Sequence, residues 1–170
     1  MERDFDPIEL FESYMKVTGV PALAPAVAED PRLQGRRLGL VNGASWISLW
    51  CDYFGRAILP GVQFVNVGNE AVQLNFMGAH SRGEPCPPQI NIDKFAQYAE
   101  DLVKLYGVDA VMITCSTMNR AHGAVREAMR RYDVPVIQID EAMMEKAVAT
   151  PIEPGTIDVA VTVTAVFAVR

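Results

Sequence analysis

Short apolar runs alternate with longer amphipathic segments along most of the chain. Five runs are dominated by apolar side chains, which is typical of strands buried on both faces of a sheet: residues 38–42, 62–67, 108–114, 134–139 and 157–164. Between them, apolar residues recur at helical spacing, which predicts helices: residues 45–59, 70–79, 91–106, 117–132 and 141–149. Strands and helices alternating in this way indicate βαβ units. The pattern predicts an α/β fold, with an open, mostly parallel sheet of about four or five strands flanked by helices.

The first 36 residues lack this alternation. Four apolar residues at helical spacing predict one short amphipathic helix there: Ile8, Leu10, Phe11 and Met15. Prolines at positions 21, 25 and 31 then predict an irregular surface strap. We therefore expect an N-terminal helix and strap over residues 1–36, followed by an α/β lobe over residues 37–170.

Composition narrows the class of protein. The 170 residues are 50% hydrophobic and 21% charged, which is typical of a globular domain. A formal charge of −6 argues against a nucleic-acid binder, because phosphate contact needs a basic face, and against binding to an anionic membrane. The three cysteines form no CxxC pair, the N-terminus lacks a signal-peptide pattern, and no apolar stretch reaches the roughly 20 residues of a membrane helix. We expect a cytoplasmic protein with reduced thiols and no nucleic-acid or membrane partner.

The loop after the run 108–114 offers the clearest chemistry. Ligands of open parallel sheets bind beyond the carboxyl ends of the strands, and Cys115 directly follows this strand and precedes a helix. A helix N-terminus favours the thiolate form, and its free N–H groups can hold a carboxylate beside the hydroxyls of Ser116 and Thr117. The alternative is that Ser116 or Thr117 only caps the helix and that Cys115 is a small core residue. The pattern leaves both interpretations open.

For the other candidate residues, a purely structural role is an alternative to a role in binding or catalysis. Asn42 and Ser45 follow the first strand and could bind an amino-acid headgroup, but taken by themselves they fit a turn residue and a helix cap better. Cys51 is expected in the core face of its helix. His80 and His122 lack metal-ligand spacing, so no metal site is predicted. Neither a Gly-x-Gly-x-x-Gly motif nor a Walker loop is present, so a nucleotide cofactor is not indicated.

Four segments together resemble a known family: GVDAVMITCSTMNRA and VPVIQIDEAMMEKAV, preceded by RLGLVNGAS and LPGVQFVNV. They resemble the first lobe of the aspartate/glutamate/hydantoin racemase superfamily, over about residues 37–164. The resemblance implies a cofactor-independent racemase or related isomerase of amino acids and their derivatives, with two similar lobes around the active site. In that family a thiolate removes the Cα proton, and a thiol of the other lobe delivers a proton to the opposite face. By resemblance, Cys115 is the acid/base, while Asn42, Ser116 and Thr117 hold the substrate carboxylate.

Two departures from the family pattern keep alternatives open. The family's Cys-Asn-Thr loop has Ser116 at its middle position here, and the second lobe with its Gly-Cys-Thr loop has no counterpart. We expect a truncated racemase-like chain in preference to a complete one-lobe protein, and the sequence leaves open whether it acts alone, as a dimer or only within a full-length parent. The apolar run near Arg170 would be an open strand, so a homo-oligomer is expected. The alternatives are a non-catalytic module that binds a small carboxylate or a partner protein, and a one-cysteine decarboxylase or cis-trans isomerase.

Overall fold

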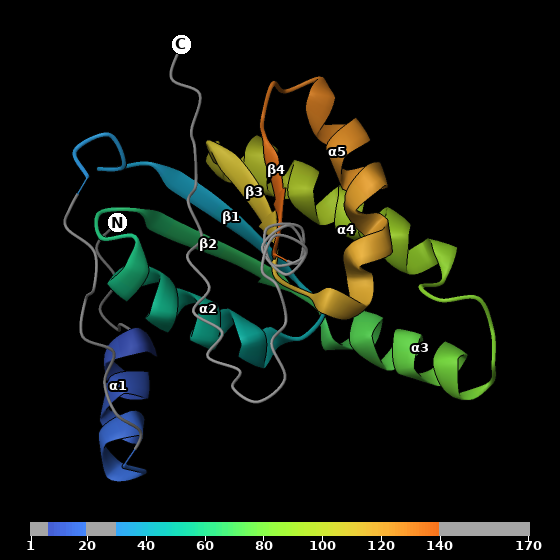
Figure 1. The fold of residues 1–170 in the computed structure, drawn as a ribbon, viewed down its shortest axis with the longest axis horizontal. Coiled ribbons are helices and arrows are strands. Elements are labelled where there is room, and N and C mark those ends of the chain that lie inside the picture. The colour runs from blue at the N-terminus through green and yellow to red at the C-terminus, as the bar shows by residue number, and fades with distance from the viewer. Residues whose placement is uncertain (1–6, 20–29, 140–170) are drawn as a thin grey trace, which may run out of the picture.

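A parallel sheet with the strand order β2-β1-β3-β4 forms the centre of the computed structural model (Figure 1). The structure describes residues 7–19 and 30–139. Within them the strands are β1 Arg37–Asn42, β2 Gln63–Gly68, β3 Ala110–Ile113 and β4 Val136–Gln138. These strands fall on four of the predicted runs and confirm the α/β prediction. The strand expected over residues 157–164 and the helix expected over residues 141–149 lie outside the described residues.

Helices connect and cover the strands. They are α1 Pro7–Val17, α2 Ser45–Ile58, α3 Glu70–Ser81, α4 Gln89–Asp101 and α5 His122–Arg130. A π-helical turn, η1 (Leu102–Tyr106), continues α4, and a 3-10 helix, η2 (Ser116–Ala121), leads into α5. Gly107 ends η1 with a φ of 70°, a left-handed conformation that glycine adopts without strain. The helix expected over residues 117–132 is therefore a 3-10 helix in its first part, and α5 ends at Arg130.

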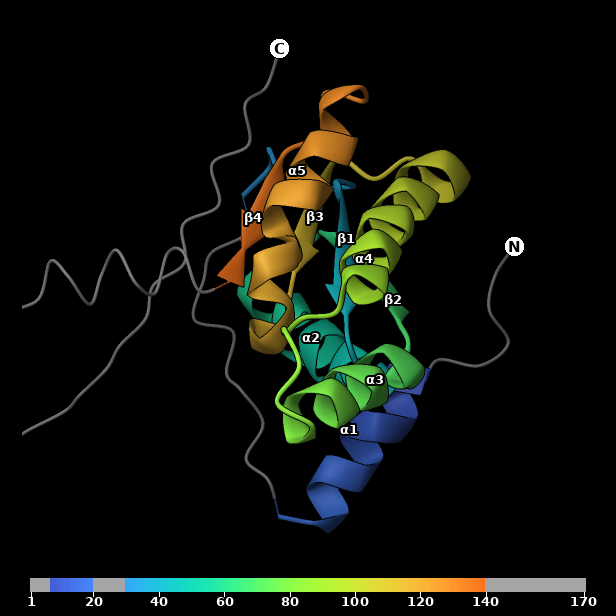
Figure 2. The same ribbon diagram turned by 90° about the vertical axis from the view of Figure 1, so that its right-hand side faces the viewer.

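Side chains that alternate along the strands divide the core into two layers. One layer faces α2 and contains Leu38, Leu40 and Ala110. The layer on the other face lies under α4 and α5 (Figure 2) and is larger. Its fully buried members include Val41, Val111, Ile113, Phe95, Val125 and Met129. Gly39 lets this layer close, because a Cβ there would lie 2.8 Å from Leu102 Cδ1.

The strand order reverses direction at β1. From β1 the chain crosses to β2, and it then returns past β1 to β3 and β4. Its connections lie on different faces: α2 covers one face of the sheet, whereas α4 and α5 cover the other. The loops that follow β1 and β3 therefore lead to opposite faces at the carboxyl edge of the sheet. In open parallel sheets, such a switch point is where ligands bind.

The predicted N-terminal helix is present as α1 and packs against α2. The ring of Phe11 lies 5.2 Å from that of Trp50 and 5.5 Å from that of Tyr53, edge to face in both cases. Met15, on the same side of α1, is buried. Of the predicted strap, residues 20–29 lie outside the described residues, and residues 31–35 form turns before β1. Among the described helices, none combines the length and the apolar character needed to cross a membrane.

Candidate functional site

The thiol of Cys115 lies at the carboxyl edge, against side chains from two other segments. Its Sγ is 3.1 Å from Thr117 Oγ1 and 3.9 Å from Gln73 Oε1. The Thr117 hydroxyl donates to the same Gln73 oxygen at 3.3 Å. A Cβ added to Gly43 would lie 3.1 Å from the sulfur and 2.8 Å from Gln73 Oε1, so the backbone of Gly43 borders the thiol directly. We call Gly43, Gln73, Cys115 and Thr117 the thiol cluster.

The 3-10 helix η2 fixes the loop that carries this thiol. Cys115 is the extended residue before η2, and its carbonyl accepts a hydrogen bond from the Met118 N–H at 3.2 Å. Met118 and Ala121 are fully buried and anchor η2 against the sheet. Cys115 itself occupies the cap position and makes no side-chain capping bond, so the alternative that Ser116 or Thr117 caps this helix is wrong. The Thr117 hydroxyl instead turns toward the thiol, whose residue is 4% exposed.

Asn42 belongs to a different group of side chains. It is fully buried; its Nδ2 donates to Ser48 Oγ at 3.1 Å, and its Oδ1 accepts a hydrogen bond from the Thr114 hydroxyl. The Cys51 thiol lies 4.0 Å from the same Oδ1. We call Asn42, Ser48, Cys51 and Thr114 the amide cluster. Its hydrogen bonds join the ends of β1 and β3 to α2.

The strand register explains why the two clusters are separate. Leu40 pairs with Met112 and Val41 with Ile113, so the register continues to Asn42 beside Thr114 and to Gly43 beside Cys115. Successive side chains of a strand point to opposite faces. Asn42 therefore shares the α2 face with Leu40, whereas Cys115 follows Ile113 onto the other face. The structure does not bring Asn42 and Cys115 together, and a substrate-binding role for Asn42 stays a prediction.

Ser116 does not belong to the thiol cluster, and the backbone of Ser45 begins α2. Ser116 is exposed, and no hydrogen bond within the described part of the chain joins it to the cluster. Ser45 is the first residue of α2, where the cap position is Ala44 and no side-chain capping bond forms. The prediction that Ser45 caps α2 is therefore wrong. Substrate contacts by Ser45 and Ser116 stay predictions.

Sequence patterns did not single out Gln73, Ser48 or Thr114. Gln73 lies in the first turn of α3, directly after β2, and such a turn is close to the carboxyl edge of the sheet. That position in the sequence could have identified Gln73 as a candidate site residue. However, α3 exposes Leu74 and Met77, so its apolar residues do not reveal which side faces the sheet. Ser48 and Thr114 are hydroxyl residues inside otherwise apolar segments, and only the register shows that they meet Asn42.

The surroundings of Cys51 favour the neutral form of its thiol. Burial raises the pKa of Cys51. The hydrogen bond to Thr114 opposes this shift, and the nearby charge of Asp52 adds to it. A thiol with a raised pKa is protonated at neutral pH and is a poor nucleophile or base. Cys51 thus fits a structural role, as its position on the core face of α2 predicted.

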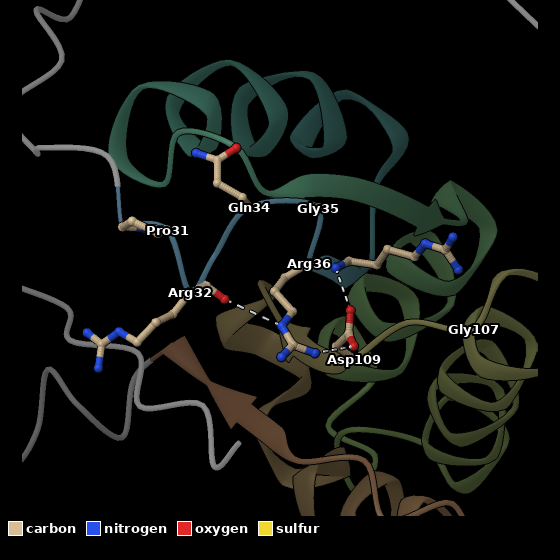
Figure 3. A pocket seen from close by; sticks show the side chains of 8 residues that line it. Pro31, Arg32, Gln34, Gly35, Arg36, Gly107 and Asp109 are labelled. Carbon is tan, nitrogen blue, oxygen red and sulfur yellow. Dashed lines mark hydrogen bonds and ion pairs between the residues drawn. The ribbon is translucent and has the colours of Figure 1, made fainter. Parts of the chain in front are cut away.

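A cavity of about 420 Å³ lies at the opposite, amino edge of the sheet (Figure 3). Its lining includes Arg32, Arg36 and Asp109. Arg36 Nη1 is 3.2 Å from Asp109 Oδ1, and Asp109 Oδ2 accepts the Arg37 backbone N–H at 2.7 Å. These bonds tie the turn before β1 to the start of β3 and neutralise the Asp109 carboxylate. The neighbouring Arg32 pairs with Asp30, and the Arg37 guanidinium donates to the Tyr106 carbonyl. Because ligands of open parallel sheets bind at the carboxyl edge, we place the candidate site at the thiol cluster and not in this cavity.

Within residues 7–19 and 30–139, no three His, Cys, Asp or Glu side chains are grouped so that they could hold a metal ion. Compared with protein-family models, with curated proteins and with solved structures, the chain matches none of them. The resemblance to the racemase superfamily therefore rests on the sequence segments alone.

Proposed function

We propose that the chain is a cofactor-independent, racemase-like isomerase of amino acids or their derivatives, with Cys115 as the group that removes the Cα proton. The observation that carries the proposal is the place of Cys115: its thiol lies at the switch point of a parallel sheet, beside the Thr117 hydroxyl and the Gln73 carboxamide. Both neighbours are uncharged hydrogen-bonding groups. The substrate class, a small carboxylate, comes from the sequence resemblance.

The proposed reaction balances without an added reagent. The Cys115 thiolate takes the Cα proton, and the electron pair of the C–H bond enters the enediolate of the neighbouring carboxylate. The Thr117 hydroxyl donates to Gln73 Oε1 in the structure, and rotation about its C–O bond lets it donate to the thiolate instead before the transfer. Return of the same proton restores the original substrate, whereas a proton from the opposite face gives the mirror image. In this arrangement Gln73 and Thr117 are the nearest groups to orient a carboxylate.

A non-catalytic binding module is the second candidate, and one observation favours it. Cys115 is only 4% exposed, and buried cysteines are often inert core residues. In that case the thiol cluster would pack the end of β3, and the chain would bind a small carboxylate or a partner without turning it over.

Exchange of the substrate Cα hydrogen separates the two candidates. The purified chain is incubated in D2O with a panel of amino acids, hydantoins and substituted malonates, and loss of each Cα proton is followed by NMR. The proposal predicts exchange that disappears in Cys115→Ser and persists in the matched control Cys86→Ser, whose thiol lies in the loop before α4. Absence of exchange with every compound would contradict the isomerase proposal and support the binding module. Chiral analysis of the exchanged product shows whether the centre is also inverted.

A further inference from the structure

Helix α1 carries an apolar stripe on the side that does not contact α2. Leu10, Tyr14 and Val17 have exposed fractions of 61%, 61% and 86%. Their spacing of four and three residues places them on one face of the helix. Phe11 and Met15 occupy the neighbouring face, where they pack on α2. Figure 1 shows α1 at the periphery of the described fold, beside α2.

We propose that this stripe pairs two copies of the chain through antiparallel α1 helices. The charges beside the stripe select both the partner and its direction. Glu9 lies in the first turn of α1 and Lys16 in the last. They are seven residues apart, so they flank the stripe on the same side of the helix. In an antiparallel pair, positions on this flank face each other, and Glu9 of each copy lies opposite Lys16 of the other.

A parallel pair would turn this flank of the two copies to opposite sides of the interface, so that Glu9 of one copy would not meet Lys16 of the other. The antiparallel pair is self-complementary, as a two-fold interface between identical chains requires. Tyr14 lies at the middle of the stripe, and tyrosine is among the residues that contribute most to protein interfaces. The stripe therefore fits a second copy of this chain without any further component.

The size of the surface sets the expected affinity. A helix with the 11 residues of α1 is about 16 Å long. Such a contact is smaller than the roughly 800 Å² per partner of a standard stable interface. We therefore expect a weak dimer, which forms at about ten to a hundred micromolar and dissociates on dilution.

Sedimentation equilibrium of the full chain over about 5 to 500 µM tests the proposal. The expected mass rises with concentration from 18.7 kDa toward twice that value. Leu10→Glu is expected to remain monomeric. Leu105→Glu is the matched control, because Leu105 is 83% exposed on η1, away from α1, and this variant is expected to dimerise like the wild type.

Charge reversal tests the direction of the pair without changing the apolar stripe. Glu9→Lys and Lys16→Glu are each expected to weaken dimerisation about tenfold, and the double variant is expected to restore it. Circular dichroism establishes that each variant is folded before its mass is compared. A wild-type chain that is monomeric at the highest concentration would overturn the proposal. So would a dimer that persists in Leu10→Glu, or a double variant that pairs no better than the single ones.

Discussion

The two polar clusters at the carboxyl edge contain consecutive residues at the ends of β1 and β3, yet their side-chain contacts differ. In the amide cluster, Asn42 is fully buried and its carboxamide is held by Ser48 and Thr114. In the thiol cluster, the Cys115 sulfur itself is the central atom, 3.1 Å from the Thr117 hydroxyl and 3.9 Å from the Gln73 carboxamide oxygen. The first arrangement fixes β1, β3 and α2 to one another. The second leaves a thiol beside a hydroxyl, and the hydroxyl donates to the Gln73 carboxamide oxygen. A shift of one residue along a strand thus separates a structural clamp from a candidate reaction centre.

The largest expected difference between the clusters is in stability. Asn42→Leu leaves the hydroxyls of Ser48 and Thr114 without their partner in a buried place, and we expect the free energy of unfolding to fall by about 3 kcal/mol. Gln73→Leu, a similar polar-to-apolar change in the thiol cluster, is expected to cost less than about 1 kcal/mol. Urea denaturation followed by circular dichroism measures both values. Equal losses in the two variants would contradict the distinction between clamp and reaction centre.

The next effect concerns the Thr117 hydroxyl. Thr117→Val keeps the shape of the side chain but removes the group 3.1 Å from the Cys115 sulfur, and we expect Cα exchange to slow about tenfold. Thr117→Ser keeps the hydroxyl and is expected to retain most of the rate. The measurement is the NMR exchange assay with whichever compound the wild type exchanges fastest. If the serine variant is as slow as the valine variant, the hydroxyl is not the group that matters.

A smaller effect concerns the amide cluster at alkaline pH. Because burial raises the pKa of Cys51, the folded chain holds this proton to higher pH than the unfolded chain does. The resulting stability is present at neutral pH and is lost as the pH rises past the ordinary cysteine value of 9.0 toward the higher value in the fold. We expect the free energy of unfolding to decline less steeply between pH 8 and pH 10 in Cys51→Ala than in wild type or Cys86→Ser. Parallel declines in all three proteins would contradict this assignment.

The smallest effects are expected at the amino edge. Arg32 pairs with Asp30 at 2.7 Å, but its side chain is 80% exposed, so we expect no measurable change in the free energy of unfolding in Arg32→Ala. It should also leave Cα exchange unchanged within about twofold, because the cavity is at the far end of the sheet from Cys115. A large loss of exchange in this variant would move the site from the thiol cluster to the cavity.

Strand and helix patterns predicted most of the described fold. The four parallel strands and α1 lie where the apolar residues indicated, and η1 ends at Tyr106, as the helical spacing over residues 91–106 predicted. The contents of the site were harder to predict. Which face Asn42 and Cys115 occupy depends on a register between β1 and β3, two strands far apart in the sequence. Once that register is known, alternation alone separates the two residues.

Helix boundaries and loop contacts were the other limits of prediction. Serine is a common N-cap residue, but Ser45 is the first residue of α2 and the cap position is Ala44. Gln73 reaches Cys115 across 42 positions of sequence, and no local pattern predicts such a contact. The residues that distinguish the two clusters are therefore set by tertiary packing at the carboxyl edge.

One measurement tests the central claim most directly: the rate of Cα exchange in Cys115→Ser and Cys51→Ser, compared in the same assay with the wild type. The two variants remove one thiol from each cluster by the same substitution, and thermal unfolding monitors whether both are folded. We predict that Cys115→Ser loses exchange by at least about a hundredfold, whereas Cys51→Ser stays within about threefold of wild type. Exchange that survives in Cys115→Ser, or that fails equally in both folded variants, would contradict the assignment of Cys115 as the base.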